Sequence, residues 1–255
     1  MRLRSRSTSI ILLLALLATA GAVAIAVSSS SAAKRPAPRR PKLPPAPRTV
    51  AAVIDSFARV ARGRYEAACR KQKIAWPPKR LTLLAFKRER TLEVWGAGES
   101  GGYARLATYR IVAASGKTGP KRREGDKQVP EGIYSLPLLN PNSSYHLSIK
   151  VGYPNGTDIA NATIPTERMG GDIYIHGRDV SIGCLAIGDR GIEELFTLAA
   201  LVPAERRRII IAPFDFRRTP GAPFPKEAAW VHEVYRKIKG DLRGFPLTGL
   251  PPHSR

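Results

Sequence analysis

Cysteine is scarce in this 255-residue chain, which contains only Cys69 and Cys184. Two cysteines cannot build a disulfide scaffold, a four-cysteine metal site or an iron–sulfur cluster. The chain also lacks the CxxC and HExxH motifs that mark common zinc sites. We therefore expect no metal and no organic cofactor.

Acidic residues are also few, with 20 Asp and Glu against 42 Lys and Arg and a formal net charge of +22. None of the first 48 residues is acidic. Such an imbalance predicts polyanionic surroundings: nucleic acid, an anionic membrane surface or a cell wall rich in carboxylates. The hydrophobic share of 43% is ordinary for a globular protein and argues against disorder of the whole chain.

The sequence of the N-terminus helps to decide among these surroundings. Three arginines precede Ile10–Val27, an apolar run without a charge, which is the layout of a secretory signal. As a helix the run would span about 27 Å, long for a cleaved segment and short for a membrane span. We predict that residues 1–33 are a signal peptide or an N-terminal membrane anchor, and both remain open. Either one predicts export to the periplasm or cell envelope, with N-terminal membrane contact in the second case, and argues against a nucleic-acid partner.

Residues 34–49 are rich in Pro and Arg and are predicted to form an extended linker. A helical lead-in is expected at 50–78: apolar residues recur at helical spacing within residues 50–73, and Trp76-Pro77-Pro78 ends the helix. Beyond it the sequence predicts a mainly β, α+β domain at 79–217, and a C-terminal helix and tail at 218–255. The individual strands are expected at 81–87, 91–95, 103–113, 132–136, 145–151, 173–176 and 208–214, and the later helices at 190–201 and 226–239. Asp189 is the predicted N-cap of the first of these helices.

The chemically informative segment is 172–189, where His176-Gly177 ends a predicted strand and Ser181-Ile182-Gly183-Cys184 follows a short loop. A histidine near a cysteine can raise the reactive thiolate fraction of that cysteine. The backbone N–H groups of Gly183 and Cys184 could stabilise an oxyanion. Together these groups fit cysteine acyl transfer, although a buried cysteine beside a strand-end histidine would show the same spacing.

These motifs resemble the L,D-transpeptidase catalytic domain (YkuD) family. The resemblance extends to Ser115–Lys121 and Glu124–Tyr134 upstream. Asn140–His146, Gly152–Asn155 and Pro213–Phe216 look like the YafK-type branch of the family. The resemblance covers about residues 79–217. It implies a β-sandwich or mixed sheets with a leading helix and two C-terminal helices.

The family resemblance also implies a mechanism on peptidoglycan stem peptides. Cys184 would attack the carbonyl at the L-centre of meso-diaminopimelate in a tetrapeptide stem and release D-Ala. His176 would serve as general base and then acid, oriented by the backbone carbonyl of Gly177, and Ser181 stands at a Ser/Thr position of the family. His146, in a predicted strand that could line the cleft, and Arg178, in the loop between the base and the nucleophile, are further candidate contacts to substrate.

Two departures from the family pattern leave the identity of the acceptor more open than the identity of the nucleophile. Cys184 follows His176 by eight positions, about half the common spacing, and Ile182 and Ala186 stand where polar residues are frequent. The acceptor is therefore open between a stem amine, a lysine of a wall-linked lipoprotein and water. Water would make the protein a peptidoglycan amidase or endopeptidase with the same Cys/His pair. A second alternative is an inactive wall-binding module.

A basic run precedes the predicted active-site strands. Lys117, Lys121, Arg122 and Arg123 lie close together in sequence. We expect this run to be a solvated surface, with the alternative that it steers acidic wall peptide toward the site.

Overall fold

The computed structural model describes residues 47–247, which belong to one compact unit. The predicted signal or anchor and nearly all of the predicted linker lie outside the described residues. Within them, no helix is both long enough and apolar enough to cross a membrane.

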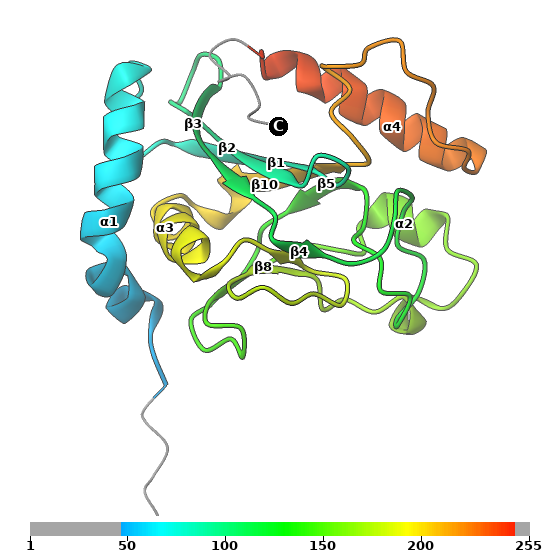
Figure 1. Cartoon of the computed structure of the whole chain (residues 1–255), viewed down its shortest axis with the longest axis horizontal. Helices are drawn as coiled ribbons and strands as arrows, with labels where there is room; N and C mark the ends of the chain where they lie inside the picture. The colour runs from blue at the N-terminus through cyan, green and yellow to red at the C-terminus, as the bar shows by residue number, and fades with distance from the viewer. Residues whose placement is uncertain (1–46, 248–255) are drawn as a thin grey trace, which may run out of the picture. The chain divides into compact units, whose positions relative to one another are not determined.

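Two five-stranded mixed sheets form the domain (Figure 1). The first sheet has the order β3 (Ala104–Arg110), β2 (Thr91–Ala97), β1 (Arg80–Phe86), β10 (Arg207–Ala212), β5 (Gly132–Ser135). The second has the order β4 (Ala113–Ala114), β9 (Leu185–Ala186), β8 (Tyr174–His176), β7 (Ser148–Lys150), β6 (Leu139–Asn140). One parallel pair lies in each sheet, β1 with β10 and β8 with β9, and the other neighbours are antiparallel.

Four α-helices and three short 3₁₀ segments complete the described chain. They are α1 (Val50–Lys71), α2 (Gly156–Ala160), η1 (Thr166–Arg168), α3 (Asp189–Ala200), η2 (Ala204–Arg206), α4 (Ala229–Asp241) and η3 (Leu242–Gly244). The predicted fold class is confirmed: mixed sheets with a leading helix and later helices.

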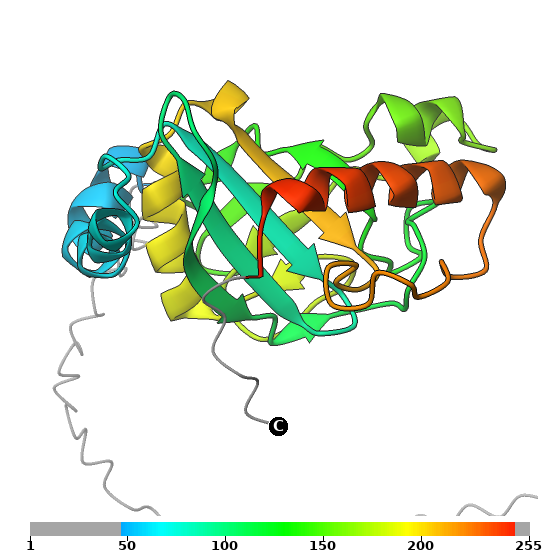
Figure 2. The ribbon, with the colours of Figure 1, turned by 90° about the horizontal axis from the view of Figure 1, so that it is seen from above.

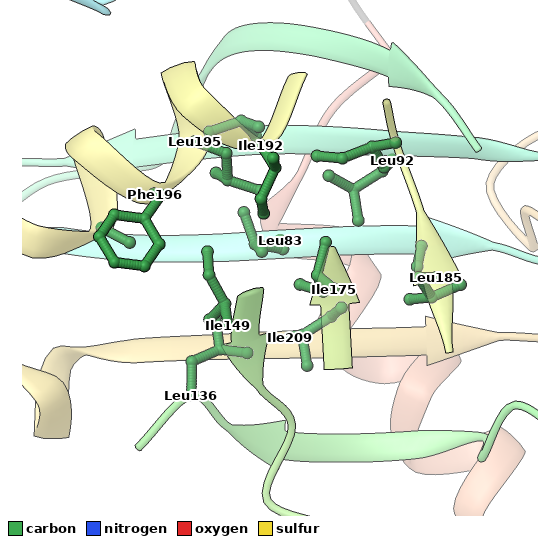
Figure 3. Packing of buried hydrophobic residues seen from close by; sticks show 14 of the residues in the cluster. Leu83, Leu92, Leu136, Ile149, Ile175, Leu185, Ile192, Leu195, Phe196 and Ile209 are labelled. Carbon is green, nitrogen blue, oxygen red and sulfur yellow. The ribbon is translucent and has the colours of Figure 1, made fainter. Parts of the chain in front are cut away.

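The main core lies between the two sheets (Figure 3). Leu83 of β1 and Ile209 of β10 meet Ile149 and Ile175 of the second sheet, and Phe196 of α3 closes one side. All five side chains are fully buried. Helix α4 covers the opposite face of the first sheet (Figure 2). Strands β1 and β10 are thus covered on both faces, which explains their nearly continuous apolar sequences.

Helix α1 lies alongside α3 at one end of the domain (Figure 1). The Thr49 side chain caps its N-terminus by accepting a hydrogen bond from the Ala52 N–H. Tyr65 of α1 hydrogen-bonds Tyr109 of β3 at 2.6 Å, and Tyr109 donates to the buried Glu194 of α3, also at 2.6 Å. This chain of hydroxyl and carboxylate groups fixes α1 onto the sheets, since each buried polar group has a partner.

Two local expectations were wrong, and one helix was missed. The strand predicted at 145–151 begins only at Ser148, because His146 adopts a φ of 77° that interrupts an extended backbone. Asp189 is not an N-cap: Gly188 holds that position, and the Asp189 carboxylate accepts a hydrogen bond from the Arg178 N–H at 2.7 Å. Helix α2 was not predicted.

The basic run also differs from expectation, because Lys121 is only 6% exposed. Its ammonium donates to Asp126 Oδ1 at 2.8 Å and to the Arg123 carbonyl at 2.6 Å. Asp126 in turn accepts the N–H groups of Arg122 and Arg123. Lys121 therefore organises its own loop and is not a solvated steering charge.

Candidate active site

The parallel pairing of β8 with β9 brings the histidine and the cysteine to one place. His176 ends β8, and Cys184 directly precedes Leu185, which pairs with Ile175. Both side chains line a cavity of about 390 Å³. The loops 140–145 and 180–184 form its other walls, together with Asp172 and Tyr174. The order of His176 and Cys184 along the chain could be read from the sequence. The pairing of β8 with β9 in the second sheet is what brings both residues to the same cavity.

The imidazole of His176 is held in a defined orientation. His176 is 2% exposed, and its Nδ1 lies 2.6 Å from the Gly177 carbonyl oxygen. A carbonyl can only accept, so Nδ1 carries the proton and Nε2 keeps a free lone pair in the neutral ring. Burial lowers the pKa of His176, and the Gly177 carbonyl opposes this more weakly. The neutral ring can therefore act as a base at neutral pH.

Gly177 occupies a position that excludes any side chain. A Cβ there would lie 2.5 Å from Asp189 Oδ1, 2.9 Å from the Tyr145 carbonyl oxygen and 3.1 Å from Ile192 Cγ2. Real Cβ atoms essentially never come within 3.0 Å of another group. The close approach places the Gly177 carbonyl against the imidazole of His176.

We expect Gly177→Ala to destabilise the protein by about 1–3 kcal/mol through overpacking. Displacement of the imidazole should also lower turnover roughly 10²-fold. Urea unfolding and stem-peptide turnover measure the two effects. The matched control is Gly63→Ala on α1, where nothing lies within 4 Å of the added methyl group. The control should gain about 0.5–1 kcal/mol. Equal stability of both variants would refute the steric argument.

Ser181 organises the loop that carries the nucleophile. Its Oγ accepts the Cys184 N–H at 3.1 Å and the Gly183 N–H at 3.3 Å, and it donates to the Cys184 carbonyl at 2.7 Å. The two N–H groups predicted to stabilise an oxyanion therefore point at a hydroxyl in this structure. Ser181 also lines the cavity.

Cys184 carries a neutral thiol in this environment. Its Sγ donates to the Asp172 carbonyl oxygen at 3.5 Å. Burial is the largest influence and raises the pKa of Cys184, while the charge of Asp172 raises it further and Lys150 lowers it. Since burial also lowers the pKa of His176, the resting pair is thiol and imidazole and not thiolate and imidazolium.

A neutral resting pair predicts a distinct pH dependence of alkylation. The reaction of Cys184 with iodoacetamide should keep rising above the ordinary thiol pKa of about 8.5, because only the thiolate reacts. Cys69 is fully buried and should stay unmodified in the folded protein. Intact-protein mass spectrometry over a pH series measures both. A rate that levels off below neutral pH would instead show a preformed ion pair.

Tyr145 is a site residue that sequence reasoning missed. Its ring centroid lies 4.6 Å from that of the His176 imidazole, with the two planes tilted by 33°. Its one signal in the sequence was an aromatic residue in a predicted strand. The loop of residues 141–146 instead carries Tyr145 over the histidine.

The start of the described chain fixes this loop. The Asn142 side chain accepts the Arg48 N–H at 2.8 Å and donates to the Arg48 carbonyl at 2.8 Å. The Arg48 guanidinium donates to the His146 carbonyl at 2.6 Å. Arg48 therefore supports the cavity wall that bears Tyr145.

Two predicted substrate contacts are not among the residues that line the cavity. His146 Nε2 lies 2.8 Å from Glu193 Oε1 of α3, and its ring contacts Phe57 of α1 edge-on. Arg178 is exposed on the loop after Gly177. Their roles toward substrate stay predictions. Within residues 47–247, no group of three or more His, Cys, Asp or Glu is placed to hold a metal ion.

Comparison with known proteins assigns the family. Residues 82–211 match the model described as YkuD, L,D-transpeptidase catalytic domain. The chain is also 34% identical over 187 residues to the Escherichia coli (strain K12) protein named "Putative L,D-transpeptidase YafK", covering 71% of this chain and 72% of that protein. The chain belongs to the YkuD L,D-transpeptidase family. The matched range lies inside the domain predicted at 79–217.

Similar solved structures include one from Campylobacter jejuni and one from Bdellovibrio bacteriovorus. The helical cell shape determining protein Pgp2 from Campylobacter jejuni is 22% identical with a TM-score of 0.44, and the match covers 53% of this chain and 48% of that one. Bd1075 of Bdellovibrio bacteriovorus is also 22% identical with a TM-score of 0.40, covering 67% and 57%. The chain thus spans about half the length of these two proteins.

Proposed function

We propose that this family member is an exported cysteine L,D-transpeptidase that acts on peptidoglycan tetrapeptide stems through a Cys184 acyl-enzyme. The observation that carries the proposal is the shared cavity of Cys184 and His176, with Nδ1 of the histidine engaged by Gly177. In this proposal residues 1–33 are a signal peptide or membrane anchor. The acceptor is a stem amine or a lysine of a wall-linked lipoprotein.

The first half of the reaction forms a thioester. Nε2 of His176 takes the Cys184 proton as sulfur attacks the carbonyl at the L-centre of diaminopimelate. The carbonyl electrons move to oxygen and then return. The C–N bond to D-Ala breaks, and the leaving amine takes the proton from the imidazolium.

The second half releases the enzyme. An acceptor amine attacks the thioester while His176 removes its proton, and the C–S bond breaks to give a new amide. The sulfur then recovers the proton from the imidazolium. If water replaces the amine, the same steps give a free carboxylate and the protein is a hydrolase.

Incubation with a meso-diaminopimelate tetrapeptide stem, with and without an acceptor amine, tests the proposal. We expect intact-protein mass spectrometry to show a tripeptide adduct, and product analysis to show a cross-link that depends on the amine. The blank is protein alkylated beforehand with iodoacetamide. A hydrolysed tripeptide alone would assign the amidase or endopeptidase alternative. An unchanged stem without an adduct would refute the enzyme and favour a wall-binding module.

A further inference from the structure

Asp172 is the only carboxylate that the described residues place in the cavity lining. Its backbone carbonyl accepts the thiol of Cys184 at 3.5 Å, so the residue adjoins the reacting sulfur. Its side chain is 91% exposed and free to meet a ligand. Among the described residues, Asp172 is thus the one acidic side chain at the cavity in a chain of net charge +22.

Lys150 places a positive charge beside this carboxylate. Its Nζ lies 3.1 Å from Asp172 Oδ1 and 4.8 Å from the centre of the Tyr174 ring. The Lys150 side chain is 24% exposed. Within residues 47–247, Asp172 Oδ2 makes no hydrogen bond. Lys150 is not itself among the residues that line the cavity, so the pair offers one free carboxylate oxygen at the cavity and a partly exposed ammonium group beside it.

We infer that Asp172 and Lys150 form a subsite for a zwitterionic α-amino-acid group of the acyl donor. The substrate ammonium lies on Asp172 Oδ2 and the substrate carboxylate on Lys150. This inference rests on the proposed function, since diaminopimelate carries such a group at its free D-centre. The ammonium and carboxylate on one carbon of the substrate complement the adjacent carboxylate of Asp172 and ammonium of Lys150. Neutralising any one of these four groups, on the substrate or on the protein, would remove one of the two contacts.

Binding to Cys184→Ala protein tests the subsite without turnover. The probes are the tetrapeptide stem and the same peptide with its D-centre ammonium acetylated, measured by calorimetry. We expect Asp172→Asn to weaken binding of the free stem roughly tenfold and to leave the acetylated stem unchanged. Lys150→Gln should behave likewise toward a stem with its D-centre carboxylate amidated. The matched control, Glu233→Gln on α4, removes an exposed paired carboxylate that does not line the cavity and should change neither affinity.

A second measurement separates a lost contact from a damaged site. In protein that keeps Cys184, Asp172→Asn removes a charge that raises the pKa of the thiol. The variant should therefore be alkylated faster than wild type near neutral pH, even though it binds the stem more weakly. A general loss of structure would not produce faster alkylation in a protein that still resists denaturant like wild type.

The outcomes distinguish this inference from the proposed function. One outcome is that the stem binds, but Cys184→Ala protein with and without Asp172→Asn shows the same preference for free over acetylated peptide. This outcome would overturn the proposed subsite and leave the enzyme assignment standing. If neither peptide binds and no acyl-enzyme forms on the protein with Cys184, both are overturned.

Discussion

Cys184→Ala should abolish acyl-enzyme formation and lower stem turnover at least ~10⁴-fold. Alanine has no nucleophile, and no other described side chain in the cavity combines a thiol with a neighbouring imidazole. The variant should still fold, because Cys184 is only partly buried and is not part of the core between the sheets. Turnover by liquid chromatography, with urea unfolding as the check on structure, measures both expectations.

Cys69→Ala is the matched control for this experiment. Cys69 is fully buried on α1, and burial raises its pKa to about 11. Its removal should cost some stability by leaving a small cavity, while turnover stays that of wild type. Substantial turnover by Cys184→Ala, or loss of turnover in a folded Cys69→Ala, would contradict the assignment of the nucleophile.

Lys87→Met should produce the largest loss of stability, about 3–5 kcal/mol, because it leaves a buried carboxylate without its cation. Lys87 Nζ lies 2.9 Å from Glu131 Oε1, with side chains 6% and 0% exposed. The same ammonium donates to the carbonyls of Gly119 and Val129, both at 2.9 Å. Tyr235 of α4 donates to Glu131 Oε2. One ion pair therefore fixes β1, the loop before β5 and α4 together.

Urea unfolding of three proteins measures this effect. Lys87→Met combined with Glu131→Gln should recover part of the loss, since no uncompensated charge remains. Arg62→Ala breaks an exposed i,i+4 pair on α1 and should change stability by less than about 0.5 kcal/mol. If Lys87→Met unfolds at the same urea concentration as Arg62→Ala, the buried Lys87–Glu131 pair does not stabilise the protein as predicted.

The Lys87–Glu131 pair also affects the active site indirectly, through the loop before β5. The carbonyl oxygen of Gln128, in the loop before β5, would lie 3.4 Å from a Cβ placed on Gly183. This loop therefore backs the turn that presents Cys184. A folded Lys87→Met protein should lose turnover through a lower kcat as well as stability.

The amphipathic helices were predictable from sequence, while the irregular segments were not. Helix α1 follows its apolar spacing, and its observed end at Lys71 is two residues before the predicted one. Helix α2 has five residues and no apolar periodicity, and its signal was the capping box of Asn155 and Asp158. The segment from Tyr145 to Leu147 looked like a strand because its residues alternate, but hydrogen bonds from distant Arg48 set its conformation.

The same division holds for the site. His176, Gly177 and Cys184 lie close together in the sequence as a local motif, so their roles could be predicted from the sequence alone. It could not show that Tyr145 stacks on the imidazole, because that contact depends on the pairing of β7 with β8. Nor could it show that Lys121 is buried, since its partner Asp126 follows in a loop with no periodic pattern.

The pairing of Arg48 with Asn142 has a mechanical consequence. A pulling force applied to the chain before residue 47 would be borne first by the hydrogen bonds of Arg48 to the Asn142 side chain and to the His146 carbonyl, and only then by α1. Tension there would tend to lift the loop that holds Tyr145 against the imidazole. Stem turnover by protein immobilised through its N-terminus, measured with and without flow, would show whether load changes the rate. Asn142→Ala should weaken such a response, while the bond from the Arg48 guanidinium to the His146 carbonyl would remain.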